Sequence, residues 1–406
     1  MENRKKFLPF LWCVLITAAA VFLITLMVCT VFFRADVEKV VAANTHSDPE
    51  YIEKVNEIVT LIDEKYIDTM DEQMLNDYLS KAAVAATGDR WSYYISAEEY
   101  DAYMEQNANA YVGIGITIQW MNKDDPGYTI VSVTSGSPAE EAGIQINDMV
   151  VAVEGNDVLE LGITEARNLV RGEEGTEVSL TILRDGTERE FKVKRATIEV
   201  EVVAFELLED DIGYIKINNF DTNCARDTLA AIESLLDDGA DALIFDLRFN
   251  PGGMKREMVE ILDYLLPEGP LFRSVNYRGE ASTDMSDANC LDIPMAVIVN
   301  DRSYSAAEFF AAALQEYEAG VIVGTQTCGK ANYQETFRLS DGSAVALSTG
   351  HYQTPNGVTL TDVGVTPDMV VEVDEETYLD IYYERLEKSE DAQLQAAISA
   401  LRKQKS

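Results

Sequence analysis

Three apolar runs in the second half of the chain constrain its fold most strongly. They cover residues 242–247, 293–299 and 321–324, and a helix-like segment follows each of the first two. A continuous apolar run of about four to eight residues is typical of a strand that is buried on both faces. Strands that alternate with helices form layered, mostly parallel sheets. The sequence therefore predicts an α/β core between residues 197 and 374.

The strand predicted at residues 293–299 leads through two serines into an alanine-rich helix. Ser303 and Ser305 lie at this junction, and the helix is expected to begin at Ala306. A hydroxyl at a helix N-terminus can attack a carbonyl carbon, and the free amides there can stabilise the resulting oxyanion. Either serine can also be a plain helix cap. Taken alone, the junction favours a cap, so a catalytic interpretation requires a base elsewhere in the chain.

Few residues of this chain can act as that base. It has two histidines, His46 in a polar linker and His351 near a turn predicted at residues 355–357. The sequence leaves His351 open as a base, although no patterned partner lies around it. Lys330 is the other candidate, because burial lowers the pKa of a lysine and Ser–Lys pairs are a known variant of the serine triad.

Three motifs resemble those of the carboxy-terminal processing (tail-specific) serine proteases. Residues 303–308 read Ser-Tyr-Ser-Ala-Ala-Glu, residues 246–253 read Asp-Leu-Arg-Phe-Asn-Pro-Gly-Gly, and residues 329–334 begin with Gly-Lys and end with Gln. The separation of 25 residues between Ser305 and Lys330 also matches that family. Three motifs in the same order and at the same spacing make the resemblance specific.

The resemblance assigns a role to each residue of the site. Ser305 is expected to attack, Lys330 to act as general base and Gln334 to orient the lysine. The amides of Gly252 and Ala306 are expected to form the oxyanion hole, and Ser303 keeps the role of a helix cap. Four positions depart from the family pattern without removing a catalytic group: Tyr304, Ala307, Cys328 and Ala331. Among these, Tyr304 and Ala331 are expected to narrow the site or change its preferred substrate.

Residues 111–196 resemble a PDZ domain. The stretch Gly113, Ile114, Gly115, Ile116 matches the carboxylate-binding loop of that family, and a short capped helix is predicted at residues 137–144. Glycines let successive backbone amides converge on one point, which suits the carboxylate at a chain terminus. The resemblance therefore implies protein or peptide substrates with a free C-terminus.

The N-terminus predicts a membrane segment. Residues 7–33 are uncharged and largely apolar, and as a helix they would extend ~40 Å, beyond the ~30 Å of a bilayer core. Lys5 and Lys6 should remain cytoplasmic. The alternative is a signal peptide cleaved near residues 18–20, but cleavage would leave the apolar residues 21–33 at the mature N-terminus. We therefore expect a single-pass anchor in the cell membrane and an extracytoplasmic catalytic body.

Composition excludes several other classes of function. The formal net charge of −39 over 406 residues disfavours nucleic-acid binding. Five cysteines without a Cys-x-x-Cys pair leave room for one disulfide but predict neither a disulfide scaffold nor a cysteine–zinc site. We expect no cofactor and no metal.

The sequence thus predicts a membrane-anchored serine endopeptidase. The resemblance implies a crotonase-like layered α/β protease core with an inserted PDZ domain, and its helical ends imply a homodimer. The expected divisions are a tail and anchor (1–34), a helical region (35–110), the PDZ domain (111–196), the protease core (197–374) and a C-terminal helical region (375–406). The alternatives are a non-catalytic PDZ-containing peptide-binding protein and a crotonase-like acyl-transfer enzyme.

Overall fold

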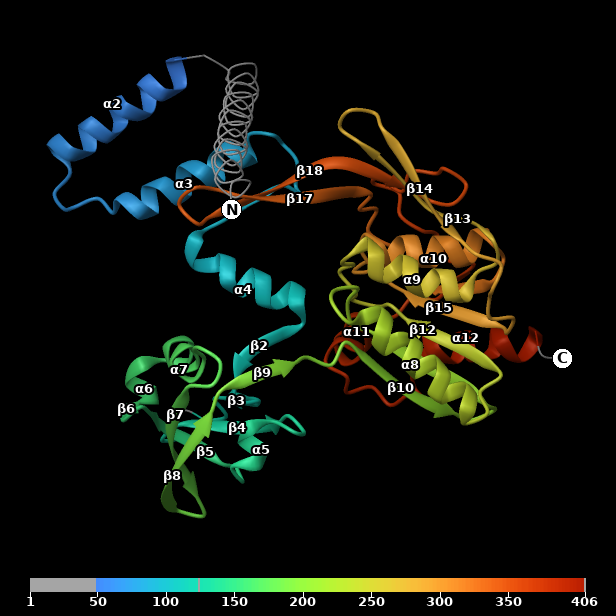
Figure 1. The fold of residues 1–406 in the computed structure, drawn as a ribbon, viewed down its shortest axis with the longest axis horizontal. Helices are drawn as coiled ribbons and strands as arrows, with labels where there is room; N and C mark the ends of the chain where they lie inside the picture. Colours follow the sequence, from blue (N-terminus) through green and yellow to red (C-terminus); the bar gives the residue numbers. More distant parts are fainter. Residues whose placement is uncertain (1–48, 123–124, 405–406) are drawn as a thin grey trace, which may run out of the picture. The chain divides into compact units, whose positions relative to one another are not determined.

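The computed structural model describes residues 49–122 and 125–404 (Figure 1). The chain divides into two compact units. The first unit ends at Asn76 and contains, in its described part, helix α2 (Pro49–Lys65) and the start of α3 (Glu72–Ala85). The anchor predicted at residues 7–33 lies outside the described residues. None of the helices between residues 49 and 404 has the length and apolar character needed to cross a bilayer.

The second unit, Asp77–Ser406, contains a six-stranded sheet with the order β10-β11-β12-β15-β16-β19. Its strands are β10 (Val203–Leu208), β11 (Ile212–Ile217), β12 (Ala242–Asp246), β15 (Met295–Val299), β16 (Gly320–Gly324) and β19 (Met369–Val370). β10 pairs antiparallel with β11, and every other neighbouring pair is parallel. The predicted, mostly parallel α/β core is therefore confirmed.

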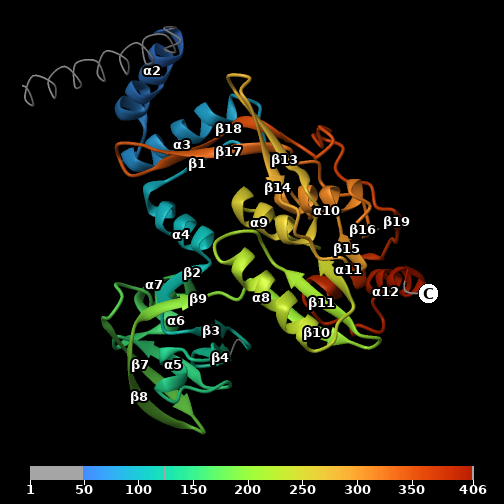
Figure 2. The same cartoon turned by 45° about the vertical axis from the view of Figure 1, so that its right-hand side comes forward.

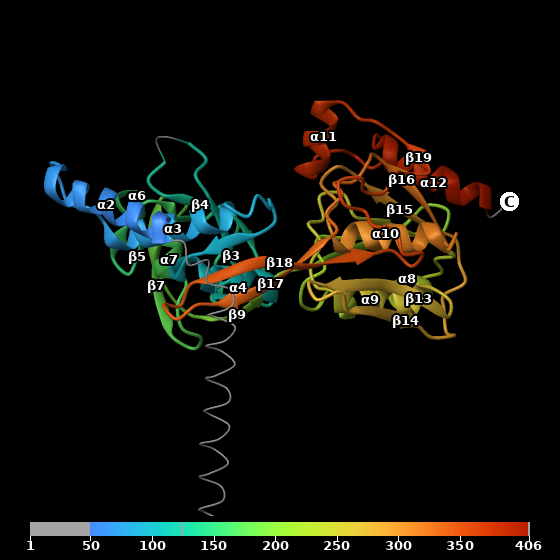
Figure 3. The same cartoon turned by 90° about the horizontal axis from the view of Figure 1, so that it is seen from above.

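Helices cover both faces of this sheet, as Figures 2 and 3 show. One face packs against α8 (Cys224–Asp237), α9 (Lys255–Leu265) and α10 (Ala306–Glu316), and the other against α12 (Ala392–Gln404). Alternate residues of β12 serve the two faces: Leu243 and Phe245 join the first cluster, and Ala242 and Ile244 join the second. This double burial explains why the strands appear as unbroken apolar runs.

A second, antiparallel sheet was not predicted from the sequence. It has the order β1-β18-β13-β14, with β17 also paired to β18. Its strands are β1 (Tyr93–Ile95), β13 (Gly269–Asn276), β14 (Ala281–Ser286), β17 (Asn332–Arg338) and β18 (Ala344–Gln353). These strands are partly exposed and carry many polar residues, so they lack the continuous apolar signal of the first sheet. Phe272 of β13 packs edge-on against Phe309 of α10, with ring centroids 5.1 Å apart.

Residues 110–199 form a third packed region with its own apolar core. Its entry strand β2 (Ala110–Gly113) pairs with its exit strand β9 (Ala196–Glu199). Between them lie β3 (Ile116–Gln119), β4 (Tyr128–Val133), α5 (Pro138–Glu141), β5 (Met149–Val153), β6 (Asn156–Asp157), α6 (Val158–Leu161), α7 (Ile163–Val170), β7 (Glu177–Arg184) and β8 (Thr187–Lys194). Ser137 caps α5 as predicted, and Ser96 with Glu99 forms a capping box at the start of α4 (Ala97–Ala108).

Candidate active site

Ser305 occupies a strained turn between β15 and α10. Its backbone angles are φ +51° and ψ −116°, and its side chain is nearly buried. Such a conformation costs a residue other than glycine ~1–3 kcal/mol and persists only where the surroundings hold it. Because α10 begins at Ala306, the Ala306 amide belongs to the free N–H groups of the helix N-terminus. The turn therefore presents a hydroxyl beside a free amide donor.

The turn before Ser305 is tied to the loop that follows β12. The hydroxyl of Ser303 donates to the carbonyl of Leu247 (2.8 Å) and accepts from the amide of Asn300 (3.0 Å). The amide of Tyr304 donates to the carbonyl of Asn250 (2.9 Å). The predicted role of Ser303 as a helix cap is wrong, because its side chain joins two loops and Ser305 occupies the N-cap position of the helix.

Gly252 brings the second predicted oxyanion donor against this turn. Its φ is +90°, and a Cβ at this position would lie 2.9 Å from the Cβ of Ser305 and 3.0 Å from the amide nitrogen of Ala306. Only glycine fits such a close approach. In this structure the Gly252 amide donates to Oδ1 of Asn250 (2.8 Å). Gly252 and Ala306 therefore flank Ser305, while the Gly252 amide already has an acceptor.

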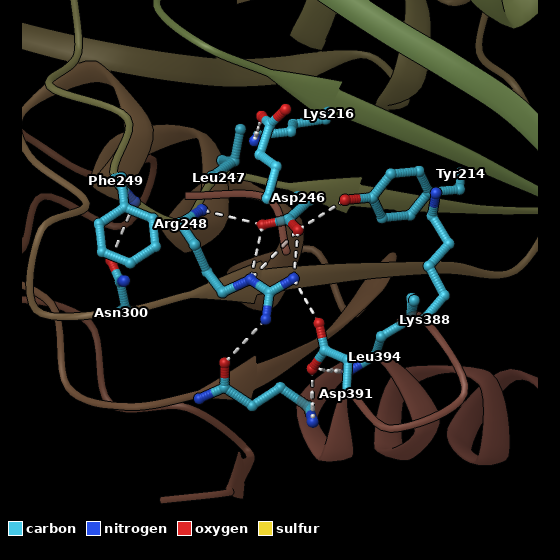
Figure 4. A network of polar contacts seen from close by, with 12 residues as sticks. Tyr214, Lys216, Asp246, Leu247, Arg248, Phe249, Asn300, Lys388, Asp391 and Leu394 are labelled. Carbon is cyan, nitrogen blue, oxygen red and sulfur yellow. Dashed lines mark hydrogen bonds and ion pairs between the residues drawn. The ribbon is translucent and has the colours of Figure 1, made fainter. Parts of the chain in front are cut away.

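A buried ionic network anchors the start of the loop that follows β12 (Figure 4). Nε of Arg248 donates to both oxygens of Asp246 (3.0 and 3.1 Å), and its Nη2 contacts Oδ2 of Asp391 at 2.8 Å. The Tyr214 hydroxyl donates to Asp246 (2.8 Å), and Nη1 of Arg248 donates to Gln393 (3.2 Å). Burial alone would raise the pKa of Asp246, but Arg248 and the hydrogen bonds hold it below its usual range. The first residues of the loop are therefore fixed to the sheet by an ionised carboxylate.

Lys330 lies on the loop between β16 and β17, with its amine over an aromatic ring. Its Nζ is 4.8 Å from the ring centroid of Trp91, which also packs edge-on against Tyr304 at a centroid distance of 6.0 Å. Burial lowers the pKa of Lys330, whereas the nearby acidic groups of Cys328, Glu308 and Asp89 act to raise it. Among the contacts of the described residues, no hydrogen bond joins this amine to Ser305. Cys328 is a free thiol, like Cys224 and Cys290.

Gln334 lies on β17, at an irregularity in its pairing with β18. Its carboxamide donates to the carbonyl of Asn332 (3.1 Å) and to the hydroxyl of Ser348 (3.0 Å). Among the hydrogen bonds of residues 49–122 and 125–404, none joins this carboxamide to the amine of Lys330. His351, the alternative base, lies in β18 opposite Asn332, and His46 lies outside the described residues.

Glu308 connects the serine turn to the lysine loop. Its carboxylate accepts from the amide of Ser305 (2.9 Å) and from the amide of Lys330 (2.8 Å). It also accepts from the Thr327 hydroxyl and the Gly329 amide, both at 2.6 Å. Burial raises the pKa of Glu308 above its usual value, although these donors favour the ionised form. The sequence motif contains Glu308, but no role was predicted for it.

Comparisons with known proteins identify the family. The model of peptidase family S41 matches residues 211–371, and a PDZ-domain model matches residues 129–184. A carboxyl-terminal-processing protease of Synechocystis is 33% identical over 350 residues, which cover 84% of this chain and 80% of that protein. A carboxy-terminal processing protease of Bacillus subtilis is 31% identical over 372 residues, covering 91% and 78%. The chain belongs to this protease family.

The protein is therefore a serine peptidase of family S41 with a PDZ domain. A structure solved as an S41 protease from Bacteroides fragilis covers 82% of this chain and 92% of its own, with a TM-score of 0.50 and 19% identity. That likeness supports the mixed α/β fold of the protease.

The PDZ domain of this protease carries a groove beside the predicted carboxylate loop. The loop runs from Gly113 at the end of β2 to Ile116 at the start of β3. The groove has a volume of about 360 Å³ and is lined by Ile114, Ile116, Ile118, Ile163, Val170 and Arg167, among others. Gly115 has φ +82°, and a Cβ there would meet the side chain of Ser137 at 2.3 Å. The predicted loop residues thus border an apolar groove with a basic rim.

Two residues of the site, Trp91 and Glu308, received no role from the sequence. Trp91, from the segment before β1, covers the Lys330 amine, and no local pattern could have associated residues so far apart in the chain. Glu308 had a usable signal, because a Ser-x-x-Glu pattern before an apolar run is typical of a capping box. In a capping box the glutamate side chain accepts from the backbone amide of the N-cap residue, here Ser305.

Proposed function

We propose that this S41 protease cleaves polypeptides through a Ser305–Lys330 dyad assisted by Gln334. The neutral amine of Lys330 accepts the Ser305 proton as Oγ attacks the scissile carbonyl carbon. The amides of Gly252 and Ala306 donate to the oxyanion. Collapse of the tetrahedral species expels the leaving amine, which takes the proton from Lys330, and water then hydrolyses the acyl-enzyme. The observation that carries this proposal is the strained Ser305 turn, packed against Gly252 at the helix N-terminus.

The surroundings of Lys330 support its role as the base. A lysine must be neutral to accept a proton, and burial lowers the pKa of this amine. The proposal also requires changes of partner, because the amine lies over Trp91 and the Gly252 amide donates to Asn250. The reaction therefore begins when the amine leaves Trp91 for the Ser305 hydroxyl.

Two substitutions test the dyad directly. Ser305→Ala and Lys330→Ala should each lower kcat by roughly 10³-fold or more, as removal of a nucleophile or its base does in other serine proteases. Lys192→Ala, which removes an exposed lysine of β8, is the matched control and should cleave at the normal rate. Cleavage at the wild-type rate by either dyad variant would overturn the mechanism.

We further propose that the PDZ groove binds the C-terminal carboxylate of the substrate. The amides of residues 113–116 would receive the carboxylate, and the apolar groove wall would receive the last side chain. A peptide with a free C-terminal acid should therefore be cleaved faster than the same peptide ending in an amide. Equal rates for the two peptides would count against C-terminal recognition.

We also propose that the protease is anchored in the cell membrane. The apolar residues 7–33 would anchor the chain in the cell membrane, with the catalytic body outside the cytoplasm. The full chain should sediment with membranes, whereas a chain that begins at residue 35 should remain in the supernatant. The crotonase-like layering of the core and a homodimer formed by the helical ends are also proposed. Superposition on a crotonase and sedimentation equilibrium, respectively, would test these two features.

A further inference from the structure

We infer that Glu308 is a positioning residue, which sets the distance between the nucleophile Ser305 and the base Lys330. The inference rests on the proposed dyad. Among the hydrogen bonds of the described residues, the Glu308 carboxylate accepts from neither the Ser305 hydroxyl nor the Lys330 amine. It acts through the backbones that carry them, from the first turn of α10.

The contacts of one carboxylate join the two catalytic segments. A single oxygen, Oε2, accepts from the amide of Ser305 (2.9 Å) and from the amide of Lys330 (2.8 Å). The other oxygen, Oε1, accepts from the hydroxyl of Thr327 and the amide of Gly329, both at 2.6 Å. The backbones of the nucleophile and the base are thus held by the same atom.

A carboxylate suits this position better than other polar groups. Both of its oxygens are acceptors, so it can satisfy four donors at once, whereas an amide side chain offers one acceptor and would direct its own N–H groups at donors. The Glu308 side chain is completely buried, so an unmatched amide there would find no water. Charge-assisted hydrogen bonds are also stronger than neutral ones. Loss of the carboxylate should therefore release the lysine loop from the serine turn.

The lysine loop is also held from its opposite side. Gly329 has φ +82°, and a Cβ there would lie 2.8 Å from the amide nitrogen of Val363. The Thr327 hydroxyl that donates to Glu308 also accepts from the amide of Val365 (2.7 Å). The loop is thus fixed between the chain near residue 363 and Glu308, and removing one support should shift Lys330. A shift of ~1 Å in a catalytic group can cost ~10²-fold in rate.

The charge of Glu308 provides a readout that a purely structural role would not change. Glu308, Cys328 and Asp89 all act on the Lys330 amine, and the negative charge of Glu308 favours its protonated form and so raises its pKa. Glu308→Gln removes that charge, whereas Glu308→Asp keeps it but shortens the reach of the side chain. The two variants therefore separate the electrostatic effect from the positioning effect.

The experiment uses the full chain, β-casein as substrate and a fluorophosphonate that labels a reactive serine. Both Glu308 variants should lose ~10²-fold in kcat with little change in KM. The acidic limb of the pH profile for labelling should move to lower pH in Glu308→Gln and stay in place in Glu308→Asp. Glu316→Gln is the matched control, because Glu316 lies at the other end of α10 and accepts from the Thr354 hydroxyl (2.6 Å) and the Asn356 amide (2.7 Å). This control should keep the wild-type rate and pH profile.

Several results would overturn the inference. A kcat of Glu308→Gln within about threefold of wild type would exclude a positioning role for Glu308. A loss of kcat equal to that of Glu316→Gln would exclude it as well. A loss with the acidic limb unmoved in both variants would leave Glu308 a purely structural residue. If Glu308→Gln does not fold, a wild-type kcat in folded Glu308→Asp would overturn the inference. If Ser305→Ala still cleaves, the proposed function itself fails, and that result is independent of every Glu308 variant.

Discussion

Three groups assigned to the reaction have other partners in this structure. The Lys330 amine lies over Trp91, the Gly252 amide donates to Asn250, and the Gln334 carboxamide donates to Ser348. The backbones of Ser305, Gly252 and Lys330 are nevertheless tied together by the buried contacts around Ser303 and Glu308. The main-chain segments that carry the proposed catalytic groups are thus held together, and the proposed mechanism requires rearrangement of side chains and of the Gly252 amide.

Replacing Lys330 with methionine should abolish cleavage and raise the melting temperature. Burial lowers the pKa of Lys330 in the folded protein, so the unfolded chain binds the proton more tightly. Below the lowered pKa the buried charge therefore reduces the free energy of unfolding. That free energy rises with pH between the lowered pKa and the ordinary pKa of lysine. Methionine removes this cost and keeps an apolar contact with Trp91. Thermal unfolding at pH 7 should show the increase, whereas Lys192→Met, at an exposed site, should not.

Replacing Gly252 with alanine should damage the oxyanion loop. The added Cβ would lie 2.8 Å from the carbonyl oxygen of Tyr304, at a φ of +90° that alanine rarely adopts. We expect a loss of ~10²–10³-fold in kcat if the Gly252 amide is an oxyanion donor, with a stability cost of ~1–3 kcal/mol from strain. Gly239→Ala is the control, because Gly239 also has a positive φ (+99°) but no other atom of the described residues lies near the position of an added Cβ. Gly239→Ala should lose stability but keep its activity. Equal losses of activity in the two variants would contradict the oxyanion role of Gly252.

Among the helices and strands, those with a local hydrophobic pattern could be predicted from the sequence. The strands β12, β15 and β16 follow from continuous apolar runs because helices cover both of their faces. The antiparallel strands β13, β14, β17 and β18 were missed because they are partly exposed and their pairing depends on distant residues. The candidate catalytic residues followed from the family motifs. The contacts of Lys330 with Trp91 and of Gln334 with Ser348 could not be predicted, because Ser348 lies in the second sheet and Trp91 lies just before its strand β1.

The start of helix α12 should matter for stability through the network in Figure 4. Asp391 contacts Arg248 at 2.8 Å and accepts from the amides of Gln393 (3.0 Å) and Leu394 (3.1 Å). Asp391→Ala should cost about 2–4 kcal/mol, because the helix loses its cap and buried Arg248 loses one of its two carboxylates. Asp374→Ala removes an exposed cap from α11 (Glu375–Tyr382) and should cost less. Urea unfolding measures both, and equal losses would mean that the contact with Arg248 contributes nothing.

At the scale of the whole molecule, the required changes of partner suggest that substrate binding and catalysis are coupled. A ligand shifts a conformational equilibrium only by its differential affinity for the two states, and about 1.4 kcal/mol changes a population ratio tenfold. If the groove of the PDZ domain favours the reactive arrangement, a C-terminal peptide should act on Ser305 without being cleaved. The S41 protease would then be most reactive when a substrate tail is bound.

This coupling predicts that a short, non-cleavable peptide acid accelerates fluorophosphonate labelling of Ser305 by about tenfold, and that its C-terminal amide does not. Ile163→Asp should abolish the acceleration, because Ile163 lines the groove and is 45% exposed. Leu159→Asp is the matched control, since Leu159 is 41% exposed on α6 and is not among the groove residues. Identical labelling rates with the acid, with the amide and without peptide would show that the groove binds substrate without influencing the site. Acceleration that survives in Ile163→Asp would place the responsive surface outside the groove.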